Sequence, residues 1–189
     1  YHEFKDMLLD APYNEGRAWP LDPRYKPVRD FLLGVYTDAV KNWDLDGLKL
    51  DFIDAFQLCG ASLQPDDRRD FASLEMALDT LMQDVTDALR ALKPDILIEF
   101  RQSYVGPAIR KYGNMLRVGD CPNDPVVNRR NSIDLRLTSG GTAVHSDMLM
   151  WHYEDTPEAA AKQVIPTLLT VPQISVLLTN ATEEQQYYH

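Results

Sequence analysis

The sequence of 189 residues has only two cysteines and no long apolar run. Cys59 and Cys121 are too far apart in the chain for a CxxC metal site and too few for a disulfide framework, so they set no compartment. A bridge between them is conceivable, but we expect none. The apolar stretches are interrupted by Asp, Lys or Gln before they reach the roughly 18 residues that a membrane span requires. We therefore predict no transmembrane helix.

The sequence also lacks an excess of basic charge. It has 19 Lys and Arg residues against 29 Asp and Glu residues, which gives a net charge of −10. Such a chain repels a phosphate backbone, so we expect no nucleic-acid partner. A neutral substrate such as a sugar is compatible with this charge, although acidic surfaces also serve solubility.

Several sequence signatures are absent as well. The sequence contains no glycine-rich phosphate loop, no Gly-x-Ser-x-Gly elbow and no Cys-His pair at a recognisable spacing. Nucleotide-dependent and serine-hydrolase chemistry are thus unsupported, and no organic cofactor is implied. The first residues show no basic region followed by an apolar core, so no signal peptide is visible, and the chain begins without Met, as an internal segment would.

What the sequence does contain is an alternation of helical and strand patterns in a globular composition, 44% hydrophobic and 25% charged. Apolar residues at three- and four-residue spacing predict a helix over 27–43. A short apolar segment at 47–53 predicts a buried parallel strand. The pattern continues with a helix at 67–92, a strand at 95–100, a helix at 107–112, a strand at 114–120, a helix at 128–137, a strand at 142–149, a helix at 157–170 and an apolar run at 174–178.

This alternation predicts an α/β fold, a partial (β/α)8 barrel with about five parallel strands. An open doubly wound sheet is the alternative. Because a closed barrel of this type uses eight strands, we expect residues 1–189 to be part of a longer catalytic domain. The remaining strands would come from further sequence or from a partner chain, and the open edge would favour association.

Two aspartates, Asp51 and Asp120, lie near the carboxyl ends of predicted strands. Glycoside hydrolysis needs two carboxyl groups, and in a (β/α) barrel these gather at that end of the sheet. The alternative is that each aspartate caps the next helix. Lys49 lies two residues before Asp51, so both should point to the same side of the strand, where the cation would keep the carboxylate ionised.

A family resemblance adds to this pattern. It is carried by LDPR at 21–24 with Val28-Arg29, by GLKLDF at 47–52 and by RVGD at 117–120. These segments resemble glycoside hydrolase family 36 and, more weakly, family 27, which are both α-galactosidase families. The resemblance implies that Asp51 is the nucleophile of a Lys-x-Asp strand end and that Asp120 is the acid/base.

The sequence departs from that family at two places. Gly119 stands where Ser is usual. Residues 99–102, Glu-Phe-Arg-Gln, stand where typical members carry a glycine-rich loop that contains a cysteine and helps to bind galactose. The departure leaves both catalytic assignments in place, but hydroxyl recognition depends on such loops, so the sugar is not fixed by the resemblance.

Other polar or aromatic residues near strand ends are candidates for substrate binding: Asp54, Arg101, Gln102, Arg117, His145, Asp147 and Trp151. Arg117 could instead pair with Asp120, Asp54 could be solvent-exposed, and Trp151 could be packed rather than stacked on a sugar. A metal site at His145, Asp147 and His152 is a further alternative, but the spacing fits no compact zinc signature, so we predict none.

From these features we predict a retaining glycosidase acting on α-galactosides or related α-linked sugars. Two alternatives stay open. One is a carbohydrate-binding or structural barrel segment without catalysis, and the other is a transglycosylase on the same scaffold. We also expect this chain alone to have weak activity or none, because missing strands would leave the pocket incomplete.

Overall fold

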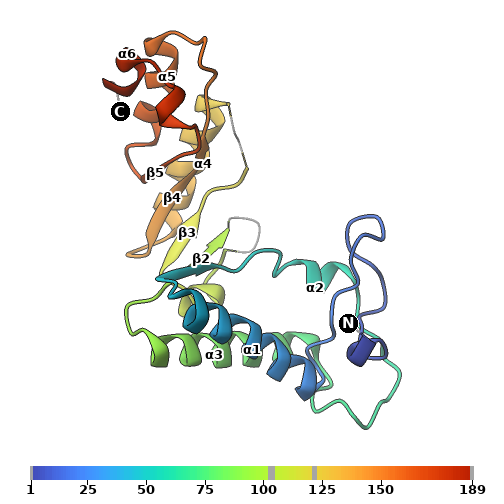
Figure 1. Ribbon diagram of the computed structural model, residues 1–189. Coiled ribbons are helices and arrows are strands. Elements are labelled where there is room, and N and C mark those ends of the chain that lie inside the picture. Colours follow the sequence, from blue (N-terminus) through green and yellow to red (C-terminus); the bar gives the residue numbers. More distant parts are fainter. Residues whose placement is uncertain (1, 102–104, 121–122, 188–189) are drawn as a thin grey trace. The chain divides into compact units, whose positions relative to one another are not determined.

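A computed structural model describes residues 2–101, 105–120 and 123–187 (Figure 1). The chain forms two compact units, Tyr1–Ile98 and Glu99–His189. Strand β2 (Leu97–Arg101) begins in the first unit and ends in the second. The first unit also contains η1 (His2–Phe4), α1 (Lys26–Trp43), β1 (Gly47–Lys49), α2 (Ala55–Leu58) and α3 (Leu74–Leu92).

The second unit continues the alternation of strands and helices. Its elements are η3 (Ile109–Lys111), β3 (Met115–Arg117), α4 (Pro125–Thr138), β4 (Ala143–Leu149), α5 (Pro157–Val164), η4 (Ile165–Thr167), β5 (Val171–Ile174), η5 (Leu178–Asn180) and α6 (Glu183–Tyr187). Among the helices that the structure describes, none is long and apolar enough to cross a membrane.

The strands form one sheet in the order β1-β2-β3-β4-β5, which is also their order in the sequence. Strands β2 to β5 pair in parallel, with Phe100 opposite Leu116 and Leu116 opposite Val144. A doubly wound sheet would instead reverse its strand order at a switch point. The prediction of a partial (β/α) barrel with five parallel strands is thus confirmed, and the doubly wound alternative is wrong.

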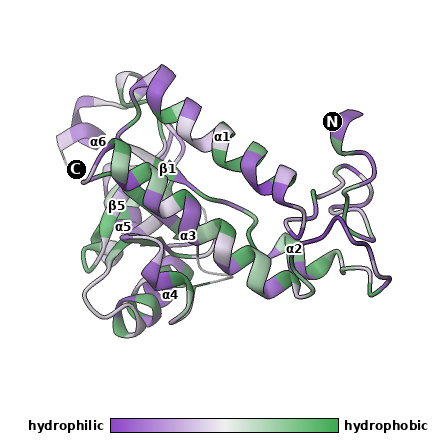
Figure 2. Ribbon diagram, turned by 90° about the horizontal axis from the view of Figure 1, so that it is seen from below, coloured by the Kyte–Doolittle hydropathy of each residue, from purple (hydrophilic) through white to green (hydrophobic). Residues whose placement is uncertain are grey.

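The core of the first unit lies between α1 and α3, which run side by side (Figures 1 and 2). Apolar residues four positions apart lie on the same face of a helix. In α3 one such stripe is fully buried: Ala77, Leu81, Val85 and Leu89. The polar residues of both helices lie between their apolar ones along the ribbon (Figure 2). The predicted helix over 27–43 is confirmed to within one residue.

Two predicted helices are shorter in the structure. Helix α3 begins at Leu74 rather than at residue 67, because Ser73 caps it by accepting a hydrogen bond from the backbone N–H of Met76. Helix α5 ends at Val164 rather than at residue 170, and a 3-10 turn follows that contains Pro166. Proline has no N–H for the next helical hydrogen bond, so the α-helix stops there.

The predicted strand boundaries also need correction. Strand β1 ends at Lys49, so Asp51 follows the strand and does not belong to it. Strand β5 precedes most of the apolar run at 174–178 and ends at Ile174. The segment predicted as a helix at 107–112 forms only the 3-10 turn at Ile109–Lys111. Short buried strands carry too few residues for hydropathy alone to mark their ends.

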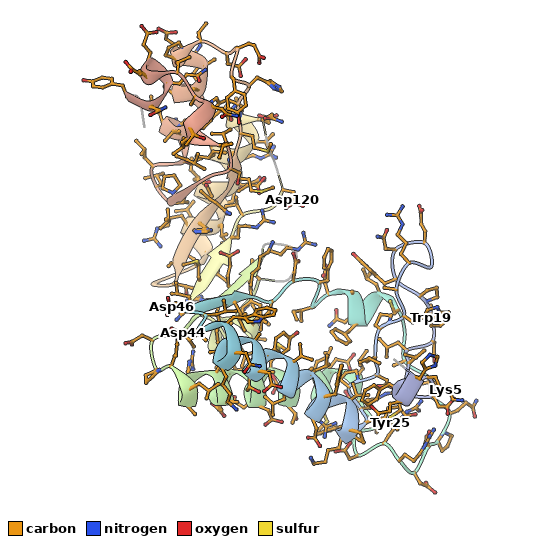
Figure 3. The ribbon with its side chains drawn as sticks, in the orientation of Figure 1. Lys5, Trp19, Tyr25, Asp44, Asp46 and Asp120 are labelled. Carbon is orange, nitrogen blue, oxygen red and sulfur yellow. The ribbon has the colours of Figure 1, made fainter. Side chains whose placement is uncertain are left out.

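Buried ion pairs fix the entry to α1. Asp22 is fully buried and accepts hydrogen bonds from the backbone N–H, Nε and one terminal nitrogen of Arg24. The Nε of Arg69 lies 3.5 Å from Oδ2 of Asp22 and donates to the hydroxyl of Tyr25. Tyr25, at the N-terminus of α1 (Figure 3), packs with Phe4 in a small apolar cluster. The LDPR segment is therefore a structural element of the first unit.

Gly47 is in close contact with β2, and we predict that its replacement by alanine destabilises the fold. A Cβ at this position would lie 2.8 Å from Cβ and 3.0 Å from the carbonyl oxygen of Leu97. Overpacking of this kind costs about 1–3 kcal/mol. Denaturant titration of Gly47→Ala measures the loss in the free energy of unfolding.

Gly34 provides the matched control. It lies in α1, and no atom is within 4 Å of the position a Cβ would take. Gly34→Ala should stabilise the protein by about 0.5–1 kcal/mol, because alanine has the higher helix propensity. Equal effects of the two substitutions would contradict the steric argument.

Candidate active site

The first group of candidate residues follows β1. Nζ of Lys49 lies 3.0 Å from Oδ2 of Asp51, and the two side chains are 39% and 27% exposed. Leu50 between them is buried, as the alternation of an extended chain requires. The other carboxylate oxygen of Asp51, Oδ1, accepts a hydrogen bond of 2.8 Å from the backbone N–H of Phe52. The Asp51 carboxylate is thus held on both sides by groups that stabilise its charge.

Phe52 is a feature of this site that the sequence did not reveal. Its φ is +57°, in the left-handed region that bulky residues rarely adopt. The ring is half-exposed, and its centroid lies 5.7 Å from that of Tyr13. Strained backbone of this kind clusters at functional sites. An aromatic residue directly after a charged strand end would have been the only signal in the sequence.

Asp54 lies at the N-cap position of α2 but makes no side-chain cap hydrogen bond. The residue is half-buried, and its Oδ1 atom is buried without a hydrogen-bond partner among the residues that the structure describes. A buried carboxylate oxygen usually has a donor. Asp54 is therefore not the solvent-exposed acid that was the alternative to substrate binding.

The second group of candidates lies on one side of the sheet in the second unit. Arg101 of β2, Arg117 of β3 and His145 of β4 are register partners in adjacent parallel strands. Register partners in a parallel pair point to the same side. Glu99 shares this side because it lies two residues before Arg101 on β2. Charged side chains are thus gathered at the carboxyl ends of β2 and β3 and beside them on β4.

Arg117 is at the centre of this group. Its guanidinium donates to Asp147, which is fully buried, and also to Oδ1 of Asp120 at 2.5 Å. NH1 of Arg101 lies 3.5 Å from the other oxygen of Asp120. Burial alone would lower the pKa of Arg117, but the hydrogen bond to Asp120 and the charges of Asp147, Asp120 and Glu99 raise it above its ordinary value.

His145 and Glu99 form a second pair on the same side of the sheet. Nδ1 of His145 lies 3.1 Å from Oε2 of Glu99, and both side chains are mostly buried. The two groups are at ion-pair distance without the alignment of a hydrogen bond. Sequence reasoning missed Glu99 as a candidate, although its two-residue spacing from Arg101 is visible in the strand.

Neither aspartate that we assigned to catalysis is a helix cap. The N-cap of α2 is Asp54, three residues after Asp51. The N-cap of α4 is Asp124, whose carboxylate accepts hydrogen bonds from the backbone N–H groups of Val126 and Val127. The capping alternative is thus wrong for both Asp51 and Asp120.

Of the residues that remain, Trp151 and Cys59 are buried in apolar clusters. Trp151 is 5% exposed and packs with Leu149, Ala160 and Val164, so it takes the packed position that was the alternative to sugar stacking. Cys59 is buried against Leu9, Leu74 and Leu78, and burial raises the pKa of its thiol. Gln102 and Cys121 lie outside the described residues.

The metal alternative finds no support in the described part of the chain. Within residues 2–101, 105–120 and 123–187, no three His, Cys, Asp or Glu side chains are grouped so that they could hold a metal ion. Asp147 pairs with Arg117, and His152 is exposed.

Comparisons with known proteins give a fold and no sequence family. No protein-family model and no curated protein sequence matches the chain. Its structure is similar to the glycoside hydrolase domain of PelA from Pseudomonas aeruginosa, with a TM-score of 0.58 and 17% identity over 95% of this chain and 72% of that one. It is also similar to a family 27 β-L-arabinopyranosidase from Geobacillus stearothermophilus, with a TM-score of 0.58 and 12% identity over 97% of this chain and 45% of that one.

Both solved structures are glycoside hydrolases of low sequence identity to this chain. A likeness of this kind concerns the arrangement of strands and helices and leaves chemistry to the site. The resemblance to family 36 in particular stays a prediction. In its arrangement of strands and helices, the chain is similar to these two glycoside hydrolase structures.

Proposed function

We propose that the chain carries the catalytic residues of a retaining glycosidase that acts on α-galactosides or related α-linked sugars. The observation that carries the proposal is the placement of two aspartates. Asp51 and Asp120 each follow the carboxyl end of a parallel strand, and each is held by cationic side chains instead of capping a helix. Active sites of (β/α) barrels are built at this end of the strands.

In the proposed reaction Asp51 is the nucleophile. Lys49 and the N–H of Phe52 hold its carboxylate oriented for attack on the anomeric carbon. Asp120 protonates the leaving oxygen and then, as its conjugate base, activates the water that releases the sugar. Retaining enzymes of this kind hold their two carboxyl groups roughly 5–5.5 Å apart.

Three other candidates, Asp54, Arg101 and Gln102, would bind the sugar. The guanidinium of Arg101 and the carboxylate of Asp54 are suited to hydroxyl groups, and Gln102 is proposed on the sequence alone. Five strands leave a barrel of eight unclosed, so we propose that further chain, from the same protein or from a partner, completes the pocket. Experiments on activity therefore require the full-length protein.

Trapping of the glycosyl-enzyme tests the proposal. An activated 5-fluoro α-galactosyl fluoride should form a covalent adduct with the full-length protein, because the fluorine slows hydrolysis of the intermediate. We expect mass spectrometry of the digest to place one fluorosugar on Asp51. The Asp51→Asn variant serves as the control and should stay unlabelled. A label on another carboxylate, or inversion in the product anomer seen by NMR, would rule the proposal out.

Two alternative functions give other results. A carbohydrate-binding barrel without catalysis would bind the sugar and form no adduct. A transglycosylase would form the same adduct but transfer the sugar to an added acceptor, since a sugar hydroxyl can replace water in the second step. Analysis of products with and without an acceptor separates the two.

A further inference from the structure

The position of Asp120 is not fixed by packing. Its side chain is 63% exposed, and its carboxylate contacts Arg117 at 2.5 Å and Arg101 at 3.5 Å. A catalytic group has to be held within about 0.5 Å of its productive position, and an exposed side chain cannot achieve this by itself. The arginines therefore fix the acid/base in place.

Arg117 is itself held by a contact with a buried residue, Asp147. Its side chain is only 6% exposed, and its other terminal nitrogen donates to Asp147 on the neighbouring strand β4. The Asp147 side chain has no exposed surface. A buried guanidinium between two carboxylates has few alternative conformations, and hydrogen bonds between charged groups are directional. Asp147, Arg117 and Asp120 thus form a chain of contacts that leads from the interior to the exposed acid/base.

The cations beside Asp120 conflict with its proposed role as a proton donor. A proton donor has to be protonated at the working pH, whereas a nearby cation favours the ionised carboxylate. In the second unit, Arg117 faces Asp147 and His145 of β4, Glu99 and Arg101 of β2, and Asp120 of its own strand end. Asp147 contributes the buried negative charge in direct contact with Arg117.

We infer that Asp147 is a positioning residue, which anchors Arg117 and offsets its charge so that Asp120 is held in place and still carries a proton. The inference rests on the proposed role of Asp120 as acid/base. It assigns to Asp147 a role through Arg117, instead of contact with the sugar.

Replacement of Asp147 by Asn tests the inference in the full-length protein. The substitution leaves Arg117 with its full charge beside Asp120, so ionised Asp120 is favoured. We expect the alkaline limb of kcat/KM to move to lower pH by roughly one unit. We also expect kcat at neutral pH to fall while KM changes little, and Asp147→Glu to restore part of the profile. Asp134→Asn on the exposed side of α4 is the matched control and should leave the profile unchanged.

A measurement that does not depend on turnover separates this inference from the proposed function. Carbon-13 NMR of the aspartate carboxyl groups, with Asp120→Asn to assign the signal, reports the titration of Asp120 directly. Its midpoint should be lower in Asp147→Asn than in the native protein. An unchanged midpoint would overturn the inference even if the protein proves to be a glycosidase. A lowered midpoint would support it even without detectable turnover.

A double variant covers the case in which Asp147→Asn fails to fold. Arg117→Gln combined with Asp147→Asn removes both buried charges, which is better tolerated than the loss of one partner. Without the guanidinium, the fall in the midpoint of Asp120 that is expected for Asp147→Asn alone should not occur, because no uncompensated cation is left beside Asp120. A midpoint below the native value in this double variant would overturn the inference.

Discussion

Asp51→Asn should lower kcat for an aryl α-galactoside on the order of 10⁴-fold, the scale of loss found when a residue of a covalent catalytic unit is removed. The amide is almost isosteric with the carboxylate and can still accept from the N–H of Phe52. Its oxygen carries no charge with which to attack the anomeric carbon, however. Steady-state kinetics of the full-length protein, with circular dichroism to check folding, measure the effect.

Asp46→Asn is the matched control for this experiment. Asp46, labelled in Figure 3, immediately precedes β1, at the strand end opposite to Asp51. Its carboxylate is exposed and pairs with Lys93. Residues at the amino ends of barrel strands serve stability and not catalysis. The control should keep its activity. Normal turnover by Asp51→Asn would remove Asp51 from the mechanism.

Asp22→Ala should lower the free energy of unfolding by about 3–5 kcal/mol, the typical cost of removing one partner from a buried ion pair. Asp22 and Arg24 have side chains that are 0% and 4% exposed, so the guanidinium left behind would lose its counter-charge without access to water. Arg69 would lose a neighbouring charge as well. Urea denaturation of the chain measures the change.

The exposed pair of Lys26 and Asp30 offers the comparison. Nζ of Lys26 lies 2.7 Å from Oδ2 of Asp30, the same distance as between Arg24 and Asp22, but the two side chains are 66% and 59% exposed. Asp30→Ala should therefore change the free energy of unfolding by at most about 1 kcal/mol. If both substitutions had the same small effect, burial would not be what makes the Asp22 pair important.

Local patterns were sufficient to predict much of the fold. The spacing of apolar residues located α1 to within one residue, and the alternation of strands and helices gave the fold class. The start of α3 could not be predicted in the same way, because the helical pattern continues upstream of the cap at Ser73. The Asp124-Pro125 pair, in contrast, is a helix start that the sequence does display.

The candidate site was less accessible from the sequence. The proximity of Lys49 to Asp51 follows from the two-residue period of an extended chain. The pairing of Arg117 with Asp120, three residues along the chain, was among the alternatives from the sequence, whereas its pairing with Asp147 depends on the register between β3 and β4, which the sequence does not specify. Whether Trp151 is buried depends in turn on how α5 packs against the end of β4. Contacts between elements thus decided which polar and aromatic residues are available to a substrate.

The backbone of Phe52 bears on how this protein can evolve. Left-handed backbone at a residue with a side chain costs about 1–2 kcal/mol, a cost that glycine at the same position would avoid. A sequence selected for stability alone would therefore place glycine directly after Asp51. Phenylalanine there implies a trade-off, in which stability is given up to keep a stiff chain beside Asp51, the proposed nucleophile.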